Sequence, residues 1–171
     1  MTHTNISTSQ HKVAIVTGAS RGIGAATAKL LGAQGYSVCV NYHKQLQAAE
    51  QVVNDIKSAG GQAIAIQADV SKEVDVVRLF AETAQQLGVV THLVNNVGVL
   101  FTQSKLVDMS LARFNRVMNT NASSCFLCCR EAIKTMQAGS AIVNVSSAAS
   151  RSGAPNEYIP VQLQSAGFRA A

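Results

Sequence analysis

The chain has 171 residues and a formal net charge of +5, from 14 basic and 9 acidic residues, and 47% of it is hydrophobic. This composition is globular, and the length suits one domain with its own core. The basic residues are scattered, whereas a nucleic-acid interface needs them clustered, so we expect no nucleic-acid partner. No apolar run is long enough to span a membrane, and residues 1–10 lack the layout of a signal peptide. We therefore expect a cytoplasmic protein with no membrane partner.

Hydrophobic periodicity alternates along the chain between strand and helix. Short β-branched runs predict strands at 13–16, 37–40, 63–68, 92–95 and 140–146, and helical spacing predicts helices at 22–34, 47–59, 72–87 and 111–137. The polar stretch 119–124 interrupts the last helix. This alternation implies βαβ units and a parallel sheet, and strands that are apolar on both faces fit a sheet covered by helices on both sides. The predicted fold class is α/β.

A glycine-rich loop, Thr17–Gly24 (TGASRGIG), lies between the first predicted strand and the first predicted helix. Gly18 lets the chain turn sharply off the strand, Gly22 admits a phosphate close to the backbone, and Gly24 allows close packing of helix on sheet. The helix N-terminus adds unpaired N–H groups and the positive end of its dipole. With a strand before it and a helix after it, the loop predicts a dinucleotide site rather than a mere glycine-rich turn, and hence a Rossmann-type doubly wound parallel sheet.

The TGxxxGxG spacing of this loop resembles that of the short-chain dehydrogenase/reductase family. Four further motifs match the family in order: Asp69-Val70, the NNVG at residues 95–98 (usually NNAG), Asn121, and Ser146-Ser147. The resemblance implies an NAD(P)-binding oxidoreductase domain over residues 12–153, with a small-molecule carbonyl or alcohol as its substrate. Members of the family are usually homo-oligomers.

The resemblance also implies roles for individual residues. Asp69 would hydrogen-bond the adenine amino group, although a helix N-terminal cap is an alternative role, which Ser71 could also fill. Asn95 would tie down the fourth strand and line the cofactor cleft. The candidate cofactor-binding residues are Thr17, Gly18, Ser20, Arg21, Gly22, Ile23, Gly24, Asn41, Lys44, Asp69, Val70, Asn95 and Gly98.

The end of the second predicted strand bears on the choice of cofactor. A carboxylate about 20 residues beyond the glycines usually grips the ribose 2′-hydroxyl of NAD. Here the sequence reads Asn41-Tyr42-His43-Lys44, with no acid. Arg21 and Lys44, with His43 as a third candidate, suit a 2′-phosphate, so NADP is predicted over NAD. The alternative is that His43 and Lys44 are only solvated loop residues.

The family's catalytic set is partly present. Its members transfer a hydride between the nicotinamide and a carbonyl or alcohol, using a Tyr as acid/base, a Lys four residues later, a Ser and an Asn. Ser147 fits the catalytic Ser, with Ser146 as the neighbouring alternative, and Asn121 fits the Asn. The Lys matters chemically because a phenol near its normal pKa of about 10 is a poor proton shuttle at neutral pH.

No YxxxK motif follows Ser147 in this sequence. Family spacing places the Tyr at residue 160 or 161, which are Pro and Val, and Tyr158 is followed four residues later by Gln162. We interpret the family pattern as C-terminally truncated and residues 154–171 as an irregular tail, hypothesised to be out-of-frame. This copy is then expected to be catalytically impaired. The alternatives are a non-catalytic dinucleotide-binding module and a non-functional fragment.

The cysteines and the N-terminus complete the predictions. Cys125 and Cys128 form a CxxC within the last predicted helix, whereas a redox motif would need a helix N-terminus and nearby cations. We interpret the cysteines of this apolar stretch as small buried thiols, and we expect no metal because no His lies nearby. Residues 1–11 are polar and are expected to be disordered. A fifth strand without further neighbours would be an exposed sheet edge.

Overall fold

The computed structural model describes residues 11–99, 102 and 105–147. Most of the expected disordered segment, and all of the tail at 154–171 with Tyr158, lie outside the described residues. His11 lies inside them. Its Nε2 is 3.1 Å from the carbonyl oxygen of Leu87 and 3.2 Å from Oγ of Ser37, so this residue is tied to the base of the sheet.

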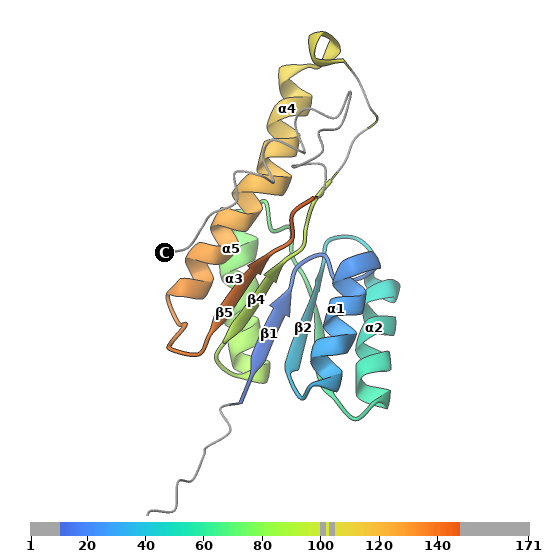
Figure 1. Ribbon diagram of the computed structural model, residues 1–171, viewed down its shortest axis with the longest axis vertical. Coiled ribbons are helices and arrows are strands. Elements are labelled where there is room, and N and C mark those ends of the chain that lie inside the picture. Colours follow the sequence, from blue (N-terminus) through green and yellow to red (C-terminus); the bar gives the residue numbers. More distant parts are fainter. Residues whose placement is uncertain (1–10, 100–101, 103–104, 148–171) are drawn as a thin grey trace, which may run out of the picture.

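Five parallel strands form one sheet in the order β3-β2-β1-β4-β5 (Figure 1). The strands are β1 Val13–Val16, β2 Ser37–Tyr42, β3 Gln62–Gln67, β4 His92–Asn95 and β5 Ala141–Asn144. β2 is longer than predicted because Asn41 and Tyr42 still pair with Ile66 and Gln67 of β3. The order places β1 between β2 and β4, with the chain winding outward on both sides, which confirms the doubly wound Rossmann-type α/β prediction.

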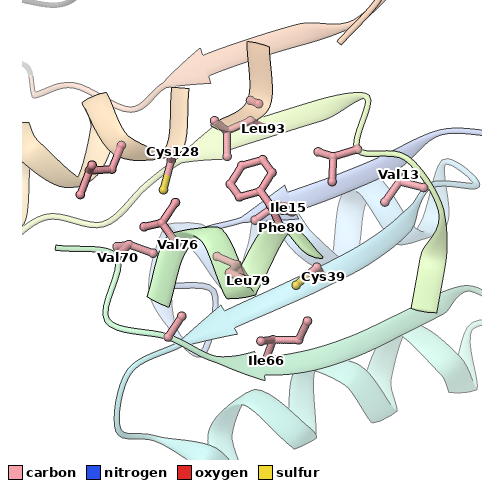
Figure 2. Packing of buried hydrophobic residues seen from close by; sticks show 14 of the residues in the cluster. Val13, Ile15, Cys39, Ile66, Val70, Val76, Leu79, Phe80, Leu93 and Cys128 are labelled. Carbon is pink, nitrogen blue, oxygen red and sulfur yellow. The ribbon is translucent and has the colours of Figure 1, made fainter. Parts of the chain in front are cut away.

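Helices cover both faces of this sheet. Helices α1 Gly22–Ala33 and α2 Leu46–Ser58 lie on one face, and α3 Glu73–Leu87 lies with α5 Ser124–Ile133 on the other (Figure 1). Each face has its own apolar cluster. Val38, Val40 and Ile56 belong to the cluster under α1 and α2. Ile15, Leu79 and Cys128 belong to the cluster on the α3 and α5 side, which Figure 2 shows.

The long helix predicted at residues 111–137 is continuous, but its hydrogen-bonding pattern changes in the middle. Helix α4 Leu111–Met118 continues through a π-helical turn, Asn119–Ser123, into α5. Ser110 caps α4 by accepting the backbone N–H of Arg113. The interruption predicted at the polar residues 119–124 is therefore a π-helical turn within one continuous helix. Such turns are often found at functional sites. A short 3₁₀ turn, Leu106–Asp108, precedes α4.

The outer strands differ sharply from the central one. Every residue of β1 is fully buried, whereas β5 is mostly exposed, with Val143 53% exposed. Within the described part of the chain β5 has a single neighbour, β4, as the sequence predicted for an edge strand. None of the helices in the described ranges is both long enough and apolar enough to cross a lipid bilayer.

Candidate cofactor and catalytic site

The carboxyl ends of β1 and β4 meet at one edge of the sheet, where the chain leaves the two strands toward opposite faces (Figure 1). Open α/β sheets bind their ligands at such a switch point. The glycine-rich loop follows β1, and the NNVG segment follows β4. The sheet therefore brings two of the motifs found in the sequence side by side.

The glycines of the loop adopt the conformations that their predicted roles require. Gly18 and Gly22 have φ values of 62° and 57°, in the left-handed region that favours glycine. A Cβ on Gly22 would meet nothing within 4 Å, so this backbone faces open space. A Cβ on Gly24 would lie 2.5 Å from Nδ2 of Asn96 and 2.7 Å from the carbonyl oxygen of Gly18. Gly24 thus packs α1 against the loop itself and against Asn96, more than against the sheet.

Thr17 and Asn96 bind each other's backbone and so lock the loop to β4. Oγ1 of Thr17 accepts the N–H groups of Asn96, at 3.0 Å, and Val97, at 3.2 Å. Nδ2 of Asn96 donates to the carbonyl oxygens of Thr17, at 2.9 Å, and Gly18, at 3.3 Å. Asn96 is the functional residue that the sequence analysis missed. Its signal was the second Asn of NNVG, which was read only as part of a family motif.

Asn41, predicted as a cofactor contact, lies beneath the loop and is 1% exposed. Its Oδ1 accepts the N–H of Gly18 at 3.2 Å, and its Nδ2 is 3.3 Å from the carbonyl oxygen of Ile66 and 3.2 Å from that of Ala68. The side-chain amide of Asn41 therefore makes its hydrogen bonds within the protein. Asn41 shapes the glycine-rich loop and joins it to the end of β3, and it does so from below the cofactor edge.

Asp69 lies at the same edge, directly after β3. Its Oδ1 accepts the backbone N–H of Ser71 at 3.2 Å and the Ser71 hydroxyl at 2.7 Å. Partial burial opposes ionisation, but these bonds and the charges of His43 and Lys72 outweigh it and hold the pKa of Asp69 below 3.8. The N-cap of α3 is Lys72, which makes no side-chain cap bond. Asp69 thus closes its own turn and does not cap the helix, and its charged carboxylate remains 24% exposed.

Three basic side chains surround this edge. Arg21 is exposed at the N-cap of α1 and makes no side-chain cap bond there. His43 and Lys44 are exposed directly after β2, and Nε2 of His43 is 3.9 Å from Oδ2 of Asp69. Ser20 is half-buried and Ile23 is 66% exposed at the start of α1. All three basic side chains therefore reach the surface at this edge.

A second group of candidate residues begins at the end of β4. Asn95 is 7% exposed, and its Nδ2 donates to Oδ1 of Asn144 at 2.9 Å and to Sγ of Cys129 at 3.3 Å, which ties β4 to β5 and to α5. Asn121, inside the π-helical turn, accepts the N–H of Val99 at 2.8 Å and donates to its carbonyl oxygen at 3.1 Å. Asn121 therefore holds the chain that follows NNVG.

The remaining candidate residues follow the ends of β5, β3 and β4. Ser146 is exposed and Ser147 is half-buried, just after β5. The backbone N–H of Val145 bonds the carbonyl oxygen of Asn95 at 2.9 Å, so this segment still follows β4. Val70 is 4% exposed and packs in the core, which leaves only its backbone for a ligand, while Gly98 is exposed.

The interpretation of the cysteines as buried thiols is half right. Cys39 and Cys128 are fully buried, but Cys125 and Cys129 are half-buried on α5. Across residues 11–99, 102 and 105–147, no group of three His, Cys, Asp or Glu side chains is arranged to hold a metal ion.

Comparison with known proteins agrees with this geometry. The family model for short chain dehydrogenases matches residues 12–159. This chain belongs to the short-chain dehydrogenase/reductase family. It is 51% identical over 152 residues to the uncharacterized oxidoreductase YgfF of Escherichia coli (strain K12). That alignment covers 86% of this chain and 62% of that protein. It is 40% identical over 148 residues to the 3-oxoacyl-[acyl-carrier-protein] reductase of Synechocystis, covering 85% of this chain and 60% of the relative.

Solved structures of the family superpose closely. A short chain dehydrogenase from Burkholderia cenocepacia in complex with NADP aligns with a TM-score of 0.86 at 34% identity, over 91% of this chain and 63% of that one. The chain spans about three fifths of the length of these relatives, at 60%, 62% and 63%. The comparisons thus show an oxidoreductase family and its fold, over the part of the fold that carries the glycine-rich loop.

Proposed function

We propose that this chain carries the NADP-binding part of an oxidoreductase that acts on a carbonyl or secondary alcohol. The observation that carries the proposal is the open backbone at Gly22, with Arg21 and Lys44 exposed at the same edge. No carboxylate takes the position at the end of β2, where Asn41 is buried and fully bonded. The related Burkholderia cenocepacia enzyme is described in complex with NADP.

The residues present fit a dinucleotide. The loop at Gly22 leaves room for a pyrophosphate beside the N-terminus of α1, where unpaired N–H groups and the helix dipole favour an anion. Asp69 offers a carboxylate acceptor for the adenine amino group, and Arg21 and Lys44 offer cations for a 2′-phosphate. Asn41, Thr17 and Asn96 hold the loop in place from within, and Asn95 ties β4 to β5 and α5. When bound, the cofactor would supply or accept a hydride.

The residues for substrate chemistry are proposed on the family pattern. Ser147 would donate a hydrogen bond to the substrate carbonyl, which favours the negative charge that develops on its oxygen. Asn121 would act beside it by fixing the backbone of Val99. The Tyr and Lys of the family are not among the 171 residues. We therefore propose that this chain by itself is catalytically impaired, and that it works in the cytoplasm on a small molecule only with a completed acid/base pair.

A non-catalytic dinucleotide-binding module is the second candidate. It is favoured by a specific contrast in the described residues: the loop is braced by several hydrogen bonds to Asn41 and Asn96, while residues 145–147 after β5 carry no acid/base pair. Such a module would bind NADP(H) as well as an intact relative does, and it would turn over no substrate.

Titration of the purified chain with NADPH and with NADH, followed by cofactor fluorescence, tests the proposal. We expect NADPH to bind at least tenfold more tightly. Arg21→Ala and Lys44→Ala should each remove much of that preference, because a charge-assisted hydrogen bond contributes about 1.5–3 kcal/mol. Lys57→Ala, at the far end of α2, is the matched control and should change neither constant. Equal dissociation constants for the two cofactors would refute the choice of NADP, and binding of neither would refute the dinucleotide site.

A further inference from the structure

Two thiols on α5 converge on a polar pair of the sheet. Cys125 and Cys129 are one helical turn apart, so they share a face of the helix. Sγ of Cys125 is 3.3 Å from Oδ1 of Asn144, and Sγ of Cys129 is 4.0 Å from the same oxygen. Asn95 donates its amide N–H to Sγ of Cys129 at 3.3 Å. Unlike the other two cysteines, which are buried, these two are half-buried.

The two thiols have opposite tendencies to ionise. Hydrogen bonding from Cys125, helped by that from Asn95, outweighs burial and lowers the pKa of Cys129 to about 7. The same pairing, together with burial, raises the pKa of Cys125. In the core, burial raises the pKa of Cys39 and of Cys128 to about 12. At neutral pH the thiolate therefore forms at Cys129, with a protonated thiol next to it, which is the arrangement of an oxidation-sensitive cysteine with a resolving partner.

We propose that Cys129 and Cys125 form a redox-active dithiol site that hydrogen peroxide converts into an intrachain disulfide. The Cys129 thiolate attacks one oxygen of the peroxide, the O–O bond breaks, and hydroxide leaves, which gives a sulfenic acid. The Cys125 sulfur then attacks the Cys129 sulfur, the S–O bond breaks, and the leaving hydroxide takes the Cys125 proton as water. Two thiols are oxidised and one peroxide is reduced to two waters.

Regular helix geometry brings the two cysteines close, but the disulfide would require this turn of α5 to tighten. Residues four apart in an α-helix have Cα atoms about 6 Å apart, within the range of about 4.4–6.8 Å for disulfides. Their Cβ atoms are about 5–6 Å apart, more than the roughly 3.5–4.5 Å of a relaxed disulfide. Closing the bond therefore tightens this turn of α5, and a strained disulfide is readily reduced by cellular thiols.

This site does not depend on the proposed cofactor chemistry, although it touches the same part of the sheet. Asn95, which contacts Cys129, directly precedes Asn96, which holds the glycine-rich loop. Disulfide formation is measured by the loss of free thiols and by the mass of the peptide, without any cofactor. A failure to form the disulfide can therefore be distinguished from a failure to bind NADP.

The test is peroxide treatment of the reduced, folded chain, followed by denaturation, thiol counting and peptide mass spectrometry. We expect two of the four cysteines to be lost and the peptide between Arg116 and Arg130 to lose the mass of two hydrogens, with no backbone fragments between Cys125 and Cys129. Dithiothreitol should restore both thiols. Cys39, in the core, serves as the internal control and should stay reduced.

Two variants separate the roles of the thiols. Cys129→Ser should form no disulfide, and Cys125→Ser should stop at a sulfenic acid that a dimedone probe labels at Cys129. Three results would overturn the proposal: a disulfide in Cys129→Ser, which would join Cys125 to Cys128; crosslinks between chains in place of the intrachain bond; or thiols that react only after unfolding in urea.

Discussion

The two sides of the switch point are built to different degrees. On the side proposed to hold the cofactor, β1 is wholly buried, and the loop that follows it is bonded from below by Asn41 and from the segment after β4 by Asn96. On the side proposed for catalysis, β5 is mostly exposed, and Ser147 follows it at the open edge of the described sheet. Both sides belong to one sheet, with only β4 between β1 and β5, yet one is enclosed and the other is open.

This difference separates binding from chemistry. The hydrogen bonds that brace the glycine-rich loop come from residues 17–97, so the loop is held in place within the described chain. The proposed hydride transfer would also need a proton donor with a tuned pKa beside Ser147.

The largest expected effect concerns turnover. The 171-residue chain should reduce ketones, aldehydes and 3-oxoacyl thioesters at least about a thousandfold more slowly than an intact relative, because general acid–base catalysis contributes roughly 10²–10⁴-fold. Misplacement of the nicotinamide by about 1 Å would cost roughly another 10²-fold. The measurement is NADPH oxidation, beside a chimera that carries the C-terminal segment of the Escherichia coli relative. Robust turnover by this chain, abolished by Tyr158→Phe, would show that it has a working acid/base group of its own.

The next effect tests whether the enclosed side is as rigid as its bonds imply. Gly24→Ala would place a Cβ 2.5 Å from Nδ2 of Asn96 and 2.7 Å from the Gly18 carbonyl oxygen. We expect a loss of about 1–3 kcal/mol in the free energy of unfolding, typical of overpacking, and at least tenfold weaker NADPH binding. Gly35→Ala is the control: it has positive φ but open space around it, so it should lower stability without changing the dissociation constant.

The sequence predicted most of this architecture because the signals were local. Strand and helix periods, the glycine spacing and the stop signals depend on near neighbours, and each predicted strand and helix is present with ends shifted by a few residues. Interactions between distant residues were harder to predict. Asn41 is a neighbour of Gly18 only through the pairing of β2 with β1, and Asn96 meets Thr17 only across β1 and β4. The half-buried state of Cys125 and Cys129 likewise depends on how α5 lies on the sheet.

A smaller effect should follow from removing the side-chain hydrogen bond that joins β4 to β5. Asn95→Ala removes the donor to Asn144 and to Cys129, so we expect a loss of about 1–2 kcal/mol in the free energy of unfolding. The pKa of Cys129 should also rise, which would slow its labelling by Ellman's reagent near neutral pH. Asn54→Ala, on the exposed face of α2, should change neither quantity. Unchanged labelling in Asn95→Ala would mean that the thiolate is stabilised without this amide.

The smallest expected effect lies at the opposite end of the strands, where β4 joins the enclosed side to the open side. His92 begins β4, its Nδ1 is 2.9 Å from Oγ1 of Thr91, and the edge of its ring meets the Tyr36 ring with 4.9 Å between centroids. Burial, helped by the charge of Lys12, lowers the pKa of His92 below 6.5.

Because the folded state holds this imidazole less protonated than the unfolded chain does, the unfolded chain binds more protons as the pH falls below 6.5. Stability from the neutral ring is therefore complete above pH 6.5 and is lost as the pH falls through the lower folded pKa. His92→Gln should flatten the dependence of the free energy of unfolding on pH in this window, measured by urea titration at several pH values. The same substitution at the exposed His43 controls for the loss of a histidine. If His92→Gln keeps the slope of the unchanged chain, other groups set the acid sensitivity, and the junction between the two sides is not where low pH first acts.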